Sequence, residues 1–218
     1  MLWFKTYKLD FFIEYIELFS AILALGCVWL AAINNVANWP IAMLSSLGYI
    51  LVFYRSQLYS DAFLNIIFLV FQCYGWFMWS NTNQRSPGNM DKRTVTLLML
   101  LFGLIYWPWV VFITQYLPSL PQWINGESAG KLPPPQYPWM DAVLMLISVL
   151  ALIMQSKRWI EHWYLWIFVD LFYVPIYYLS GNKITAALYL LYIGLAIFGY
   201  LQWLKIRKFQ HPVDIGEN

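Results

Sequence analysis

The sequence predicts an all-α membrane protein with seven transmembrane helices in a 3+1+3 arrangement: two parallel triple-helix bundles joined by a linker helix. The prediction rests on a very apolar composition, seven long apolar segments and an internal repeat. Of the 218 residues, 61% are hydrophobic and only 11% are charged, whereas a soluble domain carries about 25% charged residues. This composition excludes a soluble enzyme, a disordered chain and a disulfide scaffold. The formal charge of +2 gives no reason to expect a nucleic-acid partner.

Seven segments are apolar and long enough to cross a bilayer core, which needs roughly 20 helical residues. Backbone groups in lipid must be satisfied within their own segment, so each segment is expected to be a helix. The segments span about 15–34, 39–55, 60–79, 94–115, 138–156, 159–179 and 183–203. The expected domains are an interfacial lead-in (1–14), a first triple-helix bundle (15–79), a linker helix (94–115), a second bundle (138–203) and a cytoplasmic tail (204–218).

The distribution of basic residues predicts the orientation in the membrane. Five of the thirteen Lys and Arg fall on the N-terminal side of the predicted spans and eight on the other side, Lys92, Arg93 and Lys205 among them. Cytoplasmic loops carry the excess of Lys and Arg. The N-terminus is therefore expected outside the cell and the C-terminus in the cytoplasm.

An internal repeat relates the two halves of the chain. A shift of 124 residues aligns residues 38–79 with 162–203 without a gap, and the identical pairs include Trp39/Trp163, Gly75/Gly199 and Trp79/Trp203. The first three apolar segments thus correspond to the last three, and the fourth is a connector. Because one connector restores the chain direction, the two triplets are parallel repeats, which in transporters place the substrate site near the midplane where the halves meet.

Polar residues inside the spans are the candidate site. A polar group facing lipid is costly, about 2.5–3.5 kcal/mol for a central Asp, so these residues are expected to point inward. In segment 159–179, helical spacing puts on one face Trp163, Trp166, Asp170, Tyr173 and Tyr177. The same spacing groups Asp61, Asn65 and Gln72 in the third segment, and Asp141, Ser148 and Gln155 in the fifth.

The aromatic face with one carboxylate suits a flat cationic ligand. Aromatic rings stack on a heteroaromatic ring and attract a cation by up to about 2 kcal/mol when desolvated. The carboxylate would balance the charge or bind sugar hydroxyls. The alternative is that Trp163 belongs to an interfacial aromatic belt, as Trp3, Trp123 and Trp203 are expected to, while the tyrosines only pack. Gln72 is expected to donate an interhelical hydrogen bond in either case.

The sequence gives no support for an enzyme, a metal or a cofactor. Its two histidines, His162 and His211, lie at the edge of a span and in the tail, so they form no metal-ligand cluster. Neither a glycine-rich phosphate loop nor a Gly-x-Ser-x-Gly elbow occurs. We therefore expect a binding or transport function without a cofactor.

Short motifs in both halves resemble one known family. Asn38-Trp39-Pro40 and Tyr74-Gly75-Trp76 in the first half, and Trp163-x-x-Trp166-x-x-x-Asp170 in the second, are similar to motifs of the PnuC-type vitamin transporters. The resemblance covers roughly residues 15–205. It implies a fold like that of the SWEET sugar transporters, assembled as a homotrimer in the bacterial inner membrane. It also implies facilitated diffusion of nicotinamide riboside, a NAD precursor, which a cytoplasmic kinase then phosphorylates and traps.

The resemblance also bears on the substrate and its site. It implies that Trp163, Trp166, Asp170 and Tyr177 bind the substrate, and we expect the remaining inward polar and aromatic residues to line the site: Tyr173, Gln72, Asn65 and Ser148. Members most clearly tied to nicotinamide riboside often carry Asn where this chain has Asp170, so thiamine, another flat cation, is an alternative substrate. The spans offer no basic residue for a phosphate, which favours the vitamin over its nucleotide. A receptor that binds such a ligand without moving it is a further alternative.

Overall fold

The computed structural model describes residues 2–55, 59–81, 86–126, 131, 138–179 and 183–210, and these residues are predominantly helical. The helices are α1 (Leu2–Ala32), α2 (Asn38–Arg55), α3 (Tyr59–Ser80), α4 (Lys92–Val111), α5 (Leu120–Asn125), α6 (Pro138–Ser156), α7 (His162–Leu179) and α8 (Lys183–Gln210). A π-helical turn and a 3-10 turn join α4 to α5. The predicted lead-in and first span form one helix, α1. The side chains of Trp3 and Asp61 and the tail beyond Gln210 lie outside the described residues.

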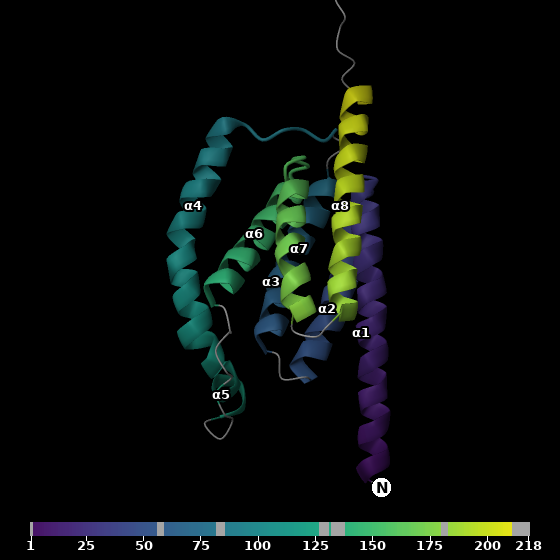
Figure 1. Ribbon diagram of the computed structural model, residues 1–218, viewed down its shortest axis with the longest axis vertical. Coiled ribbons are helices and arrows are strands. Elements are labelled where there is room, and N and C mark those ends of the chain that lie inside the picture. Colours follow the sequence, from purple (N-terminus) through teal and green to yellow (C-terminus); the bar gives the residue numbers. More distant parts are fainter. Residues whose placement is uncertain are drawn as a thin grey trace, which may run out of the picture.

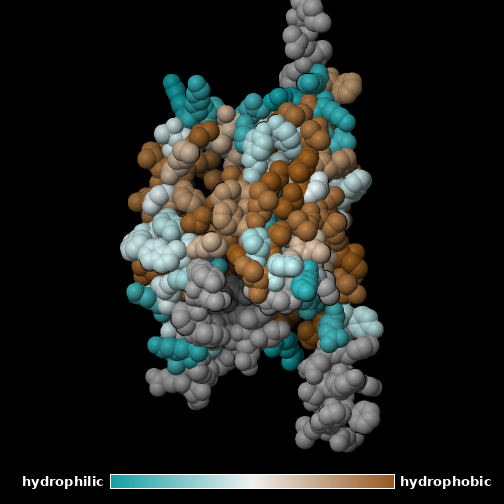
Figure 2. Space-filling view, in the orientation of Figure 1, coloured by the Kyte–Doolittle hydropathy of each residue, from teal (hydrophilic) through white to brown (hydrophobic). Residues whose placement is uncertain are grey.

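Six helices form a ring and one long helix stands beside it. Contacts run in the order α1, α2, α3, α6, α7, α8 and back to α1, whereas α4 packs on the outside of α6 (Figure 1). The N-terminus and the end of α8 lie at opposite ends of the molecule. Figure 2 shows hydrophobic residues around the middle of the visible face and hydrophilic residues gathered at its upper end. This surface pattern is that of an all-α membrane protein.

Five helical stretches of the described chain are long and apolar enough to cross a membrane: 13–32, 62–80, 92–119, 138–156 and 186–209. The other two predicted spans correspond to α2 and α7, which are each 18 residues long but less apolar than these five stretches. Their polar side chains point into the protein, since the buried residues of α2 include Asn38 and Ser46, and those of α7 include His162 and Asp170. Inward polar groups therefore contribute to the lower hydropathy of these two helices, together with exposed residues such as Arg55 and Tyr164.

The internal repeat predicted from the sequence is confirmed by the backbone. Both ends of α7 lie 124 residues after the corresponding ends of α2, α8 begins 124 residues after the start of α3, and α6 ends 124 residues after the end of α1. The turns that follow α1 and α6 match as well. Asn34 and Arg158 occupy equivalent positions, and both have a φ of 56°, which non-glycine residues seldom adopt.

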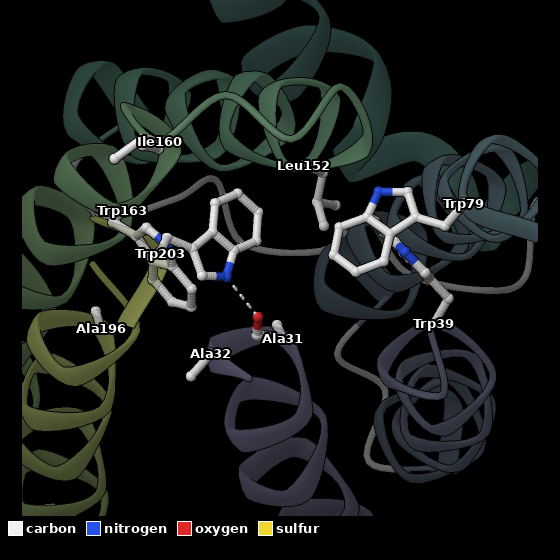
Figure 3. Packing of buried hydrophobic residues seen from close by; sticks show 9 residues of the cluster. All are labelled: Ala31, Ala32, Trp39, Trp79, Leu152, Ile160, Trp163, Ala196 and Trp203. Carbon is white, nitrogen blue, oxygen red and sulfur yellow. Dashed lines mark hydrogen bonds between the residues drawn. The ribbon is translucent and has the colours of Figure 1, made fainter. Parts of the chain in front are cut away.

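One of the buried clusters contains four tryptophans, Trp39, Trp79, Trp163 and Trp203, which we call the tryptophan cluster and which lie at the end of the ring where α1 and α6 end (Figure 3). Trp39 meets Trp79 edge-to-face with ring centroids 5.5 Å apart, and Trp163 meets Trp203 in the same way at 5.7 Å. None of the four indoles is more than 3% exposed. The two pairs are equivalent in the repeat, so the repeat extends from the backbone to the packing of side chains.

Each tryptophan pair depends on a glycine that the repeat also matches. A Cβ atom at Gly75 would collide with the ring of Trp39, and one at Gly199 would collide with the ring of Trp163. The expectation that Trp203 belongs to an interfacial belt is wrong. Its ring is fully buried, and its Nε1 donates a 2.9 Å hydrogen bond to the carbonyl oxygen of Ala31. Trp123, by contrast, is 60% exposed, as a belt residue must be.

Candidate substrate site

Helix α7 presents its predicted aromatic and acidic face to the inside of the ring. Trp163 and Asp170 are buried, and Trp166 is partly buried against the tryptophan cluster. The opposite face of the helix is exposed at Tyr164, Phe168 and Leu171. The prediction that one face of this helix points inward is confirmed. That its residues bind a substrate stays a prediction.

A group of four phenol rings lies between α7 and α8, and we call it the tyrosine cluster: Tyr173, Tyr177, Tyr189 and Tyr192. The ring centroids of Tyr173 and Tyr189 are 5.0 Å apart, and Tyr177 stacks on Tyr189 at 5.3 Å with an interplanar angle of 11°. Tyr192 meets Tyr189 edge-to-face at 5.9 Å. Such centroid separations are typical of favourable aromatic contacts. The cluster therefore offers several ring faces and edges in one place.

Asp170 lies beside this cluster and half-way along α7. Its carboxyl group interacts electrostatically with the hydroxyls of Tyr189 and Tyr192. Tyr49 of α2, on the far side of the ring, interacts in the same way with Tyr177 and Tyr192. Side chains of both repeats thus lie within electrostatic range of one another at mid-height in the ring, which is where parallel repeats are expected to hold a substrate.

The carboxyl group of Asp170 has no hydrogen-bond or ion-pair partner within the described part of the chain. The side chain is 6% exposed, and its neighbours Tyr189 and Tyr192 act on it only electrostatically. The equivalent position in the first repeat is Ser46, which accepts a 3.0 Å hydrogen bond from Nε2 of Gln72. The equivalent of Gln72 is Ala196, which has no polar group to offer. A buried charge needs a counter-charge or donors, so this position calls for a cationic or hydrogen-bonding ligand.

Trp163 and Trp166 lie on the same face of α7 but nearer its N-terminal end. Trp163 packs against Gly199 and Trp203, and its Nε1 is buried with no partner in the described structure. Trp166 follows one turn later, between the tryptophan cluster and Asp170. The structure gives Trp163 a packing role and leaves Trp166 as the indole closer to the carboxylate.

The three remaining predicted site residues lie on α3 and α6. Gln72 is buried and donates across to α2, as expected for an interhelical hydrogen bond, while its Oε1 has no partner in the described structure. Ser148 is buried, but its hydroxyl donates to the carbonyl of Leu144 in its own helix at 2.8 Å. Asn65 is half-buried and is the first-repeat equivalent of Tyr189. The hydrogen bonds of Gln72 and Ser148 therefore lead away from the tyrosine cluster.

Reasoning from the sequence missed three tyrosines of this region: Tyr189 and Tyr192, which lie near Asp170, and Tyr49, which lies near Tyr177 and Tyr192. Tyr49 could have been predicted, because the repeat aligns it with Tyr173. The two tyrosines of α8 gave no such signal, since they lie among leucines in a helix that is apolar nearly all round. No group of three or more His, Cys, Asp or Glu that could hold a metal occurs within the described residues.

Comparisons with known proteins agree with this architecture. The model of a family described as nicotinamide mononucleotide transporter matches residues 14–205. The nicotinamide riboside transporter PnuC of Escherichia coli is 23% identical over 206 residues, which cover 88% of this chain and 86% of that protein. The riboflavin/roseoflavin transporter RibM of Streptomyces davaonensis is 25% identical over 206 residues, which cover 92% of this chain and 90% of that protein.

A solved structure shares the fold. The crystal structure of the vitamin B3 transporter PnuC superimposes with a TM-score of 0.67 at 19% sequence identity, covering 90% of this chain and 83% of that one. The family match extends over both repeats and the connector between them. The chain therefore belongs to the nicotinamide mononucleotide transporter family, the PnuC-type membrane transporters.

Proposed function

We propose that the protein is a uniporter for a flat cationic vitamin, with nicotinamide riboside as its principal substrate. The observation that carries the proposal is the buried, unpartnered carboxyl group of Asp170 beside the tyrosine cluster. A pyridinium ring stacked on these phenols would gain cation–π attraction, and the carboxylate would balance its charge. Relatives named as nicotinamide riboside transporters support this choice of substrate. Facilitated diffusion inward would be kept favourable by phosphorylation of the vitamin in the cytoplasm.

The proposal includes an arrangement in the bacterial inner membrane. All seven long helices cross it in a 3+1+3 order, with α4 as linker, the N-terminus outside and the C-terminus in the cytoplasm. At 1.5 Å per residue, the 18 residues of α2 or α7 extend roughly 27 Å, close to the thickness of the hydrocarbon core. The two bundles rock about the central site to expose it to each side in turn. Exposed apolar residues of α4, such as Leu97 and Leu104, face lipid or a neighbouring subunit of a homotrimer.

The distribution of positive charge favours a riboside over a nucleotide. Within the described chain, Arg158 is the one buried Lys or Arg side chain, and it lies in the turn after α6. Its guanidinium group is 4.2 Å from the ring centroid of Trp79, where it is already engaged. No described cation lies beside Asp170 to receive a phosphate, and the carboxylate would repel one. Thiamine carries a similar aromatic cation and is the alternative substrate, whereas riboflavin, named for one relative, lacks the charge that Asp170 would balance.

Transport by purified protein in proteoliposomes tests this proposal. Labelled nicotinamide riboside should equilibrate down its own gradient without a Na⁺ or H⁺ gradient, and nicotinamide mononucleotide should not enter. Thiamine and riboflavin, measured as competitors in the same assay, rank the alternatives. A requirement for an ion gradient would contradict the uniport mechanism. Saturable binding without equilibration of intact substrate would instead identify a receptor.

A further inference from the structure

Two hydrogen bonds join the repeats at the tryptophan cluster, and the repeat relates one to the other. Trp203 of α8 donates to the carbonyl oxygen of Ala31, near the end of α1, at 2.9 Å. Trp79 of α3 donates to the carbonyl oxygens of Gln155 and Ser156, at the end of α6, at 3.3 and 3.1 Å. Ala31 and Gln155 are equivalent positions. Each bond therefore bridges one of the two seams at which a first-repeat helix meets a second-repeat helix.

At the same end of the ring, residues of the two repeats also contact each other near the axis that relates the repeats. Equivalent residues approach each other only near such an axis, and the equivalent rings of Trp79 and Trp203 have centroids 6.1 Å apart. Asn34 and Arg158 are also equivalent, and Nε of Arg158 donates to Oδ1 of Asn34 at 3.3 Å. In addition, Gln155 of α6 donates to Oδ1 of Asn38, the first residue of α2, at 3.1 Å. The axis is thus occupied by buried indoles and closed by polar contacts between the repeats.

We propose that these contacts form a latch that closes the ring at the end where α1 and α6 end, and that opening it connects the central site with that side of the membrane. This inference rests on the proposed transport function. Every bond named joins one repeat to the other, so movement of α1–α3 away from α6–α8 breaks them together. The indoles on the axis lie between the end of the ring and the mid-height site, so the substrate passes only when they separate.

Cys27 provides a reporter within the chain itself. It lies one helical turn before Ala31 on α1 and interacts electrostatically with Tyr192, so it is on the site side of the tryptophan cluster. The chain has two cysteines, and Cys73→Ser leaves Cys27 as the single thiol. The experiment measures labelling of Cys27 by a membrane-impermeant maleimide, applied from each side in vesicles of both orientations.

Trp203→Phe and Trp79→Phe keep an aromatic ring and remove the N–H donor. Each should speed labelling from the side on which α1 ends about fivefold, the population shift expected for one lost hydrogen bond, and leave labelling from the other side unchanged. Trp123→Phe, at an exposed indole, is the matched control and should change neither rate. Unchanged labelling in both latch variants, or an equal increase from both sides, would overturn the proposal.

A variant that strengthens the latch separates it from a general loosening of the fold. Asn34→Asp places a carboxylate opposite Arg158 at a backbone conformation that Asp tolerates. It should slow labelling of Cys27 from the side on which α1 ends, and faster labelling would contradict the latch. Vitamin uptake is measured separately. If the protein does not take up the vitamin but the three variants change the labelling of Cys27 as expected, only the proposed function is contradicted. If the protein takes up the vitamin but none of the three variants changes the labelling, only the latch is contradicted.

Discussion

The two repeats are nearly the same at one end of the ring and different in its middle. At the end, both halves use a tryptophan pair, a glycine that admits it and an indole hydrogen bond to the opposite half. In the middle, Gln72 donates a hydrogen bond to Ser46 in the first half, while Asp170, at the position equivalent to Ser46, shows no hydrogen bond to a described residue. The shared end explains how the halves are held together. The difference in the middle is the basis of the proposed site, because only the second half places an acidic group there.

The largest effect is expected where the two halves agree. Gly199→Ala and Gly75→Ala each place a Cβ atom against a rigid indole ring, so each should lower the free energy of unfolding by about 3 kcal/mol. Gly194→Ala, on the same helix as Gly199 but with open space around the new Cβ atom, should be neutral or stabilising. Thermal unfolding in detergent measures all three. Clearly unequal losses at Gly75 and Gly199 would show that the two tryptophan pairs are not equivalent.

The next effect is expected where the halves differ. Asp170→Asn removes the charge with little change of shape, and should weaken binding of nicotinamide riboside about 30-fold, or about 2 kcal/mol. Ser46→Ala, at the equivalent position of the first repeat, should change affinity less than about threefold because no charge is lost. Titration calorimetry on purified protein gives both values. A larger loss of affinity from Ser46→Ala than from Asp170→Asn would show that the first repeat, and not the second, recognises the substrate.

A smaller effect is expected from the tyrosine cluster. Tyr189→Leu keeps apolar volume but removes the ring that stacks on Tyr177, and should weaken substrate binding about fivefold, or about 1 kcal/mol. Tyr164→Leu, on the exposed face of α7, is the control and should leave affinity unchanged. Equal effects of the two substitutions in the same binding assay would remove the cluster from the site.

The smallest effect is expected at Ser148. Its hydroxyl is occupied by the carbonyl of Leu144 within α6, so Ser148→Ala should change substrate affinity by less than about 0.5 kcal/mol. The sequence predicts that Ser148 lines the site, whereas its hydrogen bond within α6 indicates that it does not, and the binding assay distinguishes these two possibilities. A loss of tenfold or more would restore Ser148 to the site and show that its hydroxyl turns toward the substrate.

Much of this fold could be predicted because its signals are periodic. Apolar length marked the helices, and the 124-residue repeat paired α1–α3 with α6–α8 before any contact was known. The burial of Trp203 could not be predicted in the same way. A tryptophan near the end of a span suits either a membrane interface or a core, and only the contact with Trp163 and the hydrogen bond to the carbonyl of Ala31 place Trp203 in the core.

The residues of the proposed site could be predicted from the sequence on α7 but not on α8. One carboxylate with aromatic residues at helical spacing marked the inward face of α7, since a polar group in a span needs a partner. Tyr189 and Tyr192 carry no comparable signal, because a tyrosine among leucines can face either the lipid or the protein interior. The close approach of α7 and α8 brings Tyr189 against Tyr173 and Tyr177, and it depends on packing between helices rather than on the pattern of either one.

One measurement tests the central claim, that Asp170 binds a cationic ring, most directly. Nicotinamide riboside and its dihydro form have nearly the same shape, but only the oxidised ring carries a positive charge. We predict that the unmodified protein binds the cation at least tenfold more tightly than the neutral form, and that Asp170→Asn removes this preference. If Asp170→Asn weakens both forms equally, or if the preference persists without the carboxylate, Asp170 does not recognise the charge and the account is contradicted.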